Sequence, residues 1–372
     1  MIRTIKIRLD QSNDLFQTVR IFNLACQEVL DCGYESKDFN KTRLNRWTYK
    51  TIREKYPTLP SALVQTARDK ASDMLKRDRF KHRIVKKPMS SMRYDSRTMK
   101  VYLESGRASL STVFGRLTYN FQLPEYYKQY MLWEIKNGQL VVKGNNCWLH
   151  LQVEKEAPEP TTNNDSRLGI DMGINNIAVC SDNSFYNSKH HKAVKGRYQH
   201  LKAELQSKGT RSAKRKLKKI SGRERRFVRD VNHCLSKELV RKPYGVIAME
   251  NLIGIRNEDK GRKFNKKLGN WSFHQLQSFV GYKAEALGKT VLFVKPLYTS
   301  QTCSKCGYKH KGNRDGCWFK CKSCGFQLDA DLNASRNIAT FSRSVSGRLS
   351  VNQPNVAPSV VVTSPHPLGV GY

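Results

Sequence analysis

Two closely spaced pairs of cysteines near the C-terminal end constrain this chain more than any other feature. Each pair has the form Cys-x-x-Cys followed by glycine, and the pairs consist of Cys303, Cys306, Cys321 and Cys324. Four thiolates at such a spacing close a tetrahedral site for one structural Zn²⁺, although the gap between the pairs is slightly shorter than usual. Cys317 is a rival ligand without a Cys-x-x-Cys partner. We therefore predict a zinc ribbon over residues 300–327.

The charge balance indicates a polyanionic partner. The chain has 67 Lys plus Arg against 31 Asp plus Glu, a formal net charge of +36. Such an excess repels itself in isolation and suits nucleic acid, because solubility alone requires a far smaller imbalance. In the expected zinc ribbon, the side chains available to contact nucleic acid are Lys309, His310, Lys311 and Arg314.

The remaining cysteines and the apolar pattern indicate the compartment. The other cysteines of the ten stand singly, which favours a metal site in a reducing environment over a disulfide framework. Residues 1–10 contain no long apolar run, and no segment approaches the roughly 18 apolar residues of a membrane span. We expect a cytoplasmic protein without a membrane segment.

The N-terminal half alternates between two hydrophobic periods. Residues 2–9 and several short runs within 86–156 have period two, with a turn expected at Lys136–Gly138. Residues 14–32 have helical spacing, a second helix is expected to begin with Ser61 as its N-cap, and 34–58 has room for a shorter one. These patterns predict a small β-barrel or sandwich from residues 1–10 and 86–160, with a helical insertion at 11–85.

Two further segments are expected to lie outside the cores. Residues 156–165 combine proline with small polar residues and are typical of a linker. Residues 345–372 are rich in Ser, Val and Pro with almost no charge, so we expect a disordered tail.

Three carboxylates stand at the ends of apolar segments in the C-terminal half. Asp171 and Glu250 each end an apolar strand pattern, and Asp331 opens a helix pattern. Taken singly, the first could cap a turn, the second could pair with arginine and the third could be an N-cap. Taken together, they suit phosphodiester hydrolysis, in which two Mg²⁺ ions about 4 Å apart neutralise the attacking and leaving oxygens.

A basic stretch precedes the second of these carboxylates. Residues 192–229 contain 15 Lys or Arg and two acids, Glu204 and Glu224, with apolar residues spaced for two long helices. An ordinary solvated helix face usually alternates the signs of its charges, whereas this one does not. We predict a helical hairpin facing nucleic acid through Lys214, Arg215, Lys218, Arg225, Arg226 and Arg229.

These motifs together resemble the TnpB family, RNA-guided endonucleases encoded by insertion sequences and related to type V CRISPR effectors. The resemblance covers about residues 165–340, and Trp271 before a helix ending at Tyr282–Glu285 belongs to it. Its main motifs, in family order, are Leu168–Asn175, Met249–Leu252, Tyr298–Gly307, Cys321–Phe326 and Asp329–Ile338. The N-terminal half agrees with the family in pattern only.

The resemblance implies a fold and a set of partners. It implies an α/β nuclease domain of the RuvC-like (RNase H) fold over 161–299 and 328–344, with Asp171, Glu250 and Asp331 as ligands of two Mg²⁺. Asp331, not Asp329, matches the family's acid because it stands two residues before Asn333. The barrel would be a wedge domain and its insertion a recognition domain that together read a short motif beside the target.

The implied partners are a guide RNA from the element's own end and target double-stranded DNA, bound by a protein that we expect to be a monomer. Two other functions remain open from the sequence. One is an RNA-guided DNA-binding repressor, which would be expected to have lost at least one acid of the triad. The other is an accessory DNA-binding protein for transposition, which would leave the buried carboxylates unexplained.

Overall fold

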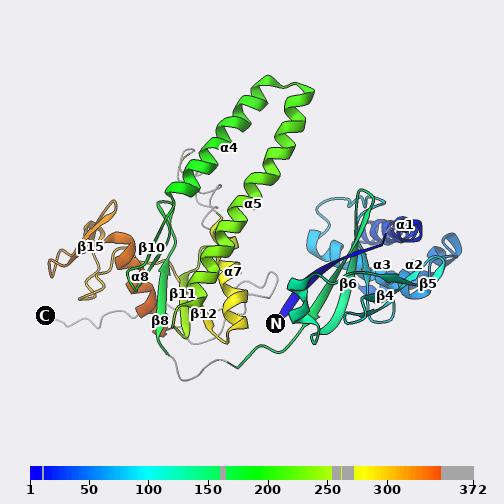
Figure 1. The fold of residues 1–372 in the computed structure, drawn as a ribbon, viewed down its shortest axis with the longest axis horizontal. Coiled ribbons are helices and arrows are strands. Elements are labelled where there is room, and N and C mark those ends of the chain that lie inside the picture. Colours follow the sequence, from blue (N-terminus) through cyan, green and yellow to red (C-terminus); the bar gives the residue numbers. More distant parts are fainter. Residues whose placement is uncertain (11, 160–164, 254–260, 262–271, 345–372) are drawn as a thin grey trace. The chain divides into compact units, whose positions relative to one another are not determined.

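A computed structural model describes residues 1–10, 12–159, 165–253, 261 and 272–344 (Figure 1). The chain forms two compact units, Met1–Glu156 and Ala157–Tyr372. Each unit has its own core. The expected tail at 345–372, part of the expected linker and Trp271 lie outside the described residues.

The first unit contains two antiparallel sheets. The larger has the order β1-β7-β6-β2, formed by β1 (Ile2–Leu9), β7 (Asn146–Glu154), β6 (Glu134–Lys143) and β2 (Met92–Tyr94). The smaller contains β3 (Met99–Tyr102), β4 (Arg107–Thr112) and β5 (Gly115–Asn120), and a 3-10 helix, η1 (Glu125–Tyr130), follows it. β1 pairs with β7 from Ile2 opposite Glu154 to Leu9 opposite Cys147, so the first strand joins the later ones as expected. Closure of these two sheets into a barrel remains a prediction.

One detail of this unit differs from expectation. Lys136–Gly138 is not a turn but part of β6, where the register with β7 shifts between Ile135 and Asn137. A bulge of this kind accommodates one extra residue without ending the strand. Turn-forming residues such as Asn-Gly can therefore lie inside β6. Gly138 also leaves room for Met99, whose sulfur would lie 2.8 Å from an added Cβ.

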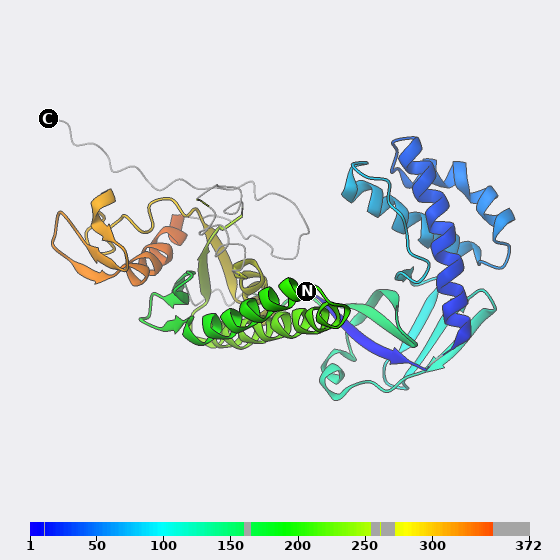
Figure 2. The same ribbon diagram turned by 90° about the horizontal axis from the view of Figure 1, so that it is seen from above.

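Three helices lie between β1 and β2, and Figure 2 shows them gathered together beside the sheets. They are α1 (Asn13–Glu35), α2 (Lys41–Lys55) and α3 (Ser61–Asp78). Ser12 and Asn40 cap the first two through their side-chain oxygens. The prediction for the third was wrong by one residue, because Pro60 occupies the N-cap position and Ser61 begins the helix. Proline is suited to this boundary, since its missing N–H and fixed φ cost nothing there.

The second unit is built on a five-stranded mixed sheet of order β10-β9-β8-β11-β12. The strands are β10 (Phe185–Asn187), β9 (Asn176–Cys180), β8 (Arg167–Asp171), β11 (Val246–Glu250) and β12 (Thr290–Val294). The first three form an antiparallel meander, whereas β11 is parallel to β8 and β12 is parallel to β11. The expected α/β architecture of this region is therefore confirmed.

Helices cover both faces of this sheet. Ile170 and Met249 share one core with the C-terminal part of α5 (Arg211–Arg241) and with α7 (Phe273–Ala286). On the opposite face, Ala248 packs against α8 (Ala330–Phe341). Gly169 faces α8 so closely that an added Cβ would lie 2.0 Å from the Ser335 carbonyl oxygen. The absence of a side chain at Gly169 thus allows α8 to pack this closely against the sheet.

A helical hairpin and a small insert complete this unit. The helix α4 (Lys189–Lys208) runs antiparallel to the first part of α5 and forms a hairpin with it (Figure 1). Between β12 and α8 lies a small insert with the sheet β13-β14-β15, formed by β13 (Arg314–Asp315), β14 (Trp318–Lys320) and β15 (Gln327–Asp329), and with the 3-10 helix η2 (Lys311–Asn313); η3 (Ser342–Ser344) follows α8. Within the described part of the chain, no helix combines the length and apolarity that a bilayer span requires.

Candidate metal centres and nucleic-acid surface

The structure brings Asp171 and Glu250 to the same edge of the sheet. Both residues end their strands, and β8 and β11 are adjacent and parallel, with Ile170 opposite Met249. The preceding three residues of each strand are buried, which fixes the strand ends within the core. Because parallel strands deliver their carboxyl ends to one edge, the two carboxylates become neighbours although residues 172–249 separate them.

Asp331 reaches the same place from the first turn of α8. The N-cap of this helix is Asp329, whose Oδ1 accepts the backbone N–H groups of Asp331 and Leu332, both at 3.0 Å. Asp331 therefore does not serve as the N-cap, and its carboxylate is available for other contacts. Its Oδ2 accepts from Asn176 Nδ2 at 3.2 Å, and its Oδ1 accepts from Arg314 Nη2 at 3.0 Å.

The charges of the other two acids act on Asp171. Burial, followed by the charges of Glu250 and Asp331, raises the pKa of Asp171 well above its ordinary value, and Arg314 opposes this. Burial also raises the pKa of Glu250, against the hydrogen bond from Thr299 and the charge of Arg314. Like charges gathered in a poorly solvated place favour a cation among them. These carboxylate oxygens are the hard ligands that Mg²⁺ prefers, so the donor set fits this ion.

Two residues of this centre were missed or misjudged from the sequence. Arg314 was expected only as a contact to nucleic acid, whereas its guanidinium pairs with Asp331. Thr299 was not singled out, yet its hydroxyl donates to Glu250 Oε1 at 2.5 Å. Neither contact follows a sequence spacing, because each joins segments that only the tertiary fold brings together. The available signal was the presence of an arginine, Arg314, in the insert that leads to Asp331.

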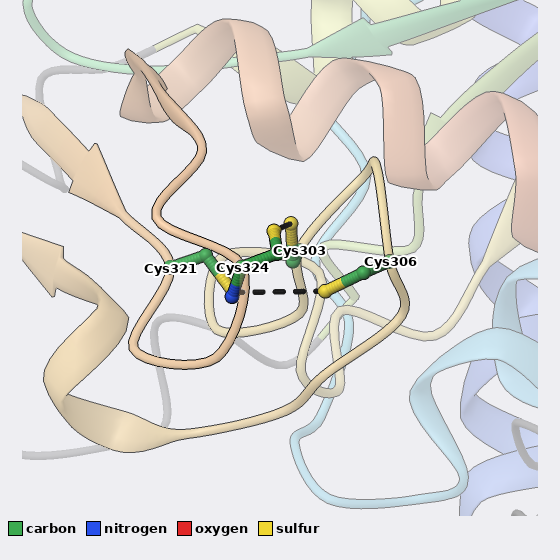
Figure 3. Close-up of side chains that lie close together, drawn as sticks. All are labelled: Cys303, Cys306, Cys321 and Cys324. Carbon is green, nitrogen blue, oxygen red and sulfur yellow. Dashed lines mark hydrogen bonds between the residues drawn. The ribbon is translucent and has the colours of Figure 1, made fainter.

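The four cysteines of the two predicted knuckles converge (Figure 3). The Sγ atoms of Cys303 and Cys324 lie 3.8 Å apart, and those of Cys306 and Cys321 lie 3.6 Å apart. All four ligand atoms lie within 4.8 Å of one another. A tetrahedral Zn²⁺ with bonds of about 2.3 Å requires sulfurs about 3.8 Å apart, so the cluster has the size that such an ion needs.

Cys317 does not belong to this cluster. It is exposed on the insert, and all ten cysteines of the chain are free thiols. The backbone carbonyl of Cys317 accepts the N–H of Ala330, so this residue contributes to the start of α8 through its main chain. The sequence-based choice among the five cysteines of the insert therefore agrees with the geometry.

The basic hairpin displays the predicted cations. All six predicted side chains lie on α5 and are exposed, namely Lys214, Arg215, Lys218, Arg225, Arg226 and Arg229. The hairpin is closed by an apolar seam that includes Leu205, Ala213 and Ile220. Glu224 pairs with Lys202 across the seam, and Glu204 pairs with Lys208, so both acids are internally neutralised. The outer face retains a strong positive charge, which is the electrostatic requirement for binding a phosphate backbone.

Two family models match this chain. Residues 150–254 match the model OrfB_IS605, described as a probable transposase, and residues 273–338 match Cas12f1-like, TNB domain. The first match contains Asp171, Glu250 and the basic hairpin. The second contains the four cysteines, Arg314 and Asp331.

Relatives of known name match between 35% and 57% of this chain. The CRISPR-associated endodeoxyribonuclease Cas12f1 of Sulfoacidibacillus thermotolerans is 32% identical over 219 residues, which are 52% of this chain and 50% of that protein. A TnpB-like protein of Methanocaldococcus jannaschii is 38% identical over 134 residues, 35% of this chain and 48% of that protein. InsQ of Escherichia coli strain K12, provisionally named an RNA-guided DNA endonuclease, is 27% identical over 233 residues, 57% of this chain and 58% of that protein.

The chain thus spans about half the length of the relatives it matches. Both family models and the relatives agree with the resemblance seen in the sequence motifs, and the two family models fall on the segments that build the two centres and the hairpin. By both family models and by these relatives, this chain is similar to TnpB-like and Cas12f1-like proteins.

Proposed function

We propose that this protein is an RNA-guided DNA endonuclease with a RuvC-like nuclease domain. The observation that carries the proposal is the convergence of Asp171, Glu250 and Asp331 from β8, β11 and α8, close enough for the charges of the latter two to perturb the first. The β10-β9-β8-β11-β12 order, with a meander followed by two parallel strands, supports the RuvC-like assignment. The names of the relatives support a DNA substrate and RNA guidance.

In this proposal the three carboxylates hold two Mg²⁺ ions. When bound, the ions supply an activated water and neutralise charge on the attacking and leaving oxygens. The chain's own contribution is to hold the ligands rigidly: β8 and β11 fix Asp171 and Glu250, and Asp329 caps α8 so that Asp331 is free to bind. Arg314, which pairs with Asp331, is placed to attract a phosphate oxygen of the DNA strand.

The cysteine cluster is proposed to hold one structural Zn²⁺. Four thiolates leave no open coordination position, so the ion would stabilise the insert without taking part in hydrolysis. The bound Zn²⁺ would thereby hold in place the insert that carries Arg314. Thiolate ligation also requires reduced cysteines, which agrees with a cytoplasmic location.

The proposed partners are a guide RNA and target double-stranded DNA. The exposed cations of α5 would bind a phosphate backbone, while base pairing between guide and target would read the sequence. The first unit, with its two sheets and helical insertion, would act as wedge and recognition domains that read a short motif beside the target. We propose that the protein works as a monomer.

Purification of the full-length protein followed by sequencing of the bound RNA tests this function. We expect one dominant RNA with a variable end, and we expect cleavage of a duplex matching that end in the presence of Mg²⁺. Changing the guide segment alone should move the cut to the new matching site. Cleavage that persists after RNA removal would indicate a simple nuclease, and guided binding without cleavage would indicate a repressor.

The contribution of the hairpin is tested separately by replacing Arg225, Arg226 and Arg229 with glutamine. Each phosphate contact contributes to the salt dependence of binding, so the slope of log affinity against log salt should fall by about one unit per lost contact. An unchanged slope for the co-purifying RNA would place the RNA elsewhere.

A further inference from the structure

Glu250 is held by a residue outside its own strand. The hydroxyl of Thr299, only 2% exposed, donates to Glu250 Oε1 at 2.5 Å. The backbone carbonyl of Glu250 accepts Gln277 Nε2 at 2.7 Å. One carboxylate oxygen and the main chain of Glu250 are therefore both fixed, which leaves Oε2 as the freer oxygen for a metal ion.

The backbone before Thr299 has a conformation that only strong local contacts maintain. Tyr298 has a φ of 65°, in the left-handed region that residues other than glycine rarely adopt. Its carbonyl oxygen accepts three hydrogen bonds, from the N–H groups of Gln301 and Thr302, both at 3.0 Å, and from the Thr302 hydroxyl at 2.9 Å. Strained backbone of this kind persists where the surroundings over-determine it, and it is concentrated at functional sites.

Two buried asparagines of α8 anchor the segment that follows Tyr298. Asn337 Nδ2 donates to the carbonyl oxygens of Thr299 and Thr302, both at 2.7 Å. Asn333 Nδ2 donates to the Thr302 carbonyl at 2.8 Å. The two asparagines are four residues apart on one face of α8. Asn333 is 0% exposed and Asn337 is 3% exposed. The path of residues 299–302 is thus set by a helix face.

Asn333 also contacts the first cysteine knuckle. Asn333 Oδ1 accepts the N–H of Ser304 at 2.9 Å, and Ser304 stands between Cys303 and Cys306. A continuous set of hydrogen bonds therefore connects the thiolate cluster, through Asn333 and Asn337, to Thr299 and so to Glu250. This route is separate from the covalent one, in which Cys324 leads along the chain to Asp331.

We propose that Thr299 is a positioning residue that orients the Glu250 carboxylate, and that Asn333 and Asn337 tie it to the zinc-binding knuckle. The inference rests on the proposed function, since it assigns Glu250 to the metal centre. The physical reason is that a hydrogen bond to one oxygen of a metal-binding carboxylate fixes the orientation of its other oxygen. Partners of this kind, when removed, typically cost about 10- to 100-fold in metal affinity or activity.

Three single variants of the full-length, RNA-loaded protein test the role of Thr299. Thr299→Val keeps the shape but removes the hydroxyl, and Thr299→Ser keeps the hydroxyl. Thr340→Val is a matched control, because the exposed Thr340 hydroxyl donates to the Arg336 carbonyl and takes no part in the 299–302 segment. We expect Thr299→Val to lower kcat by about 10- to 100-fold with the KM for DNA unchanged. Thr299→Ser and Thr340→Val should remain within about threefold of the parent protein.

Binding of Mn²⁺, measured by titration without DNA, supplies a readout that does not depend on cleavage. Thr299→Val should weaken Mn²⁺ binding about tenfold, with zinc content and melting temperature unchanged. Parent-like Mn²⁺ binding by Thr299→Val, or equal losses in Val and Ser variants, would overturn the inference. A parent protein that binds Mn²⁺ but never cleaves guided DNA would instead overturn the proposed function, and the titration would still decide the role of Thr299.

The link from the 299–302 segment to α8 is tested with a double-mutant cycle. Asn337→Leu removes both bonds to the 299–302 segment, and we expect it to lower kcat while one zinc per chain is retained. If Asn337 acts through Thr299, the double variant should be little worse than the poorer single variant. Full multiplication of the two effects would show that Asn337 acts independently, and a zinc-free Asn337→Leu protein would show that it serves the cluster alone.

Discussion

The carboxylate centre and the cysteine cluster lie in one unit but are assembled in opposite ways. Asp171, Glu250 and Asp331 come from β8, β11 and α8, and only the sheet and its covering helix bring them together. The four cysteines come from two short turns, and their spacing along the chain nearly determines their geometry. The carboxylate centre therefore depends on the tertiary fold, whereas the cysteine cluster depends mainly on local spacing.

The two centres also differ in how their charged groups relate to stability and metal binding. In the carboxylate centre, burial and like charges raise the pKa of Asp171, so the arrangement costs stability until a cation binds. In the cysteine cluster, the size of the sulfur tetrahedron suits Zn²⁺, and metal binding would contribute folding free energy directly. The comparison suggests that one centre is organised for reaction and the other for structure.

The largest effect is expected at the carboxylate centre. Asp171→Asn removes a proposed metal ligand, and cleavage should fall by about 10³-fold or more because several kcal/mol of transition-state stabilisation are lost. Guided DNA binding should remain, since it rests on many phosphate contacts. The same variant should melt at a higher temperature in Mg²⁺-free buffer, because a buried like charge has been removed. A lower melting temperature would contradict the contrast between the centres, and exposed Asp230→Asn serves as the control.

A smaller effect is expected for the residue that joins the two regions. Arg314 lies on the insert yet pairs with Asp331, so Arg314→Ala should lower cleavage by about 10²-fold with zinc content unchanged. Arg314→Lys should recover part of this loss, since it restores charge without the planar fork. Cleavage rates and zinc analysis of these variants, compared with exposed Lys320→Gln, measure the effect. Parent-like cleavage by Arg314→Ala would separate the insert from the reaction.

The cysteine cluster should affect cleavage only indirectly. Cys306→Ser should lose most of the zinc and lower the melting temperature, because the metal contributes to folding of the insert. Cleavage should fall by about tenfold through loss of order around Glu250 and Asp331. Cys317→Ser, which changes an exposed thiol of the same insert, should retain zinc and activity. Full zinc occupancy in the Cys306→Ser protein would show that the ligand set was misassigned.

The same contrast explains which features could be predicted from the sequence. The cysteine ligands follow from local spacing, and strand patterns ending in Asp171 and Glu250 were visible because buried parallel strands are continuously apolar. That β8 and β11 are neighbours, and that Arg314 and Thr299 reach the acids, depends on packing between distant segments. Local errors had local causes: Lys136–Gly138 has turn-forming residues but contains a bulge, and Pro60 precedes Ser61 at the start of α3.

The smallest effect is expected for the acid beside Asp331, and it tests the assignment most closely. Asp329 and Asp331 are two residues apart, but Asp329 caps α8 while Asp331 faces Asn176 and Arg314. Asp329→Ala should cost about 1 kcal/mol of stability through loss of the cap, and cleavage should fall only a few-fold. Asp329→Asn should be nearly neutral, since asparagine caps as well as aspartate. Asp331→Asn, in contrast, should behave like Asp171→Asn. If Asp329→Asn abolished cleavage while Asp331→Asn did not, the two acids would have exchanged roles, and α8 would deliver its N-cap, not its first turn, to the metal centre.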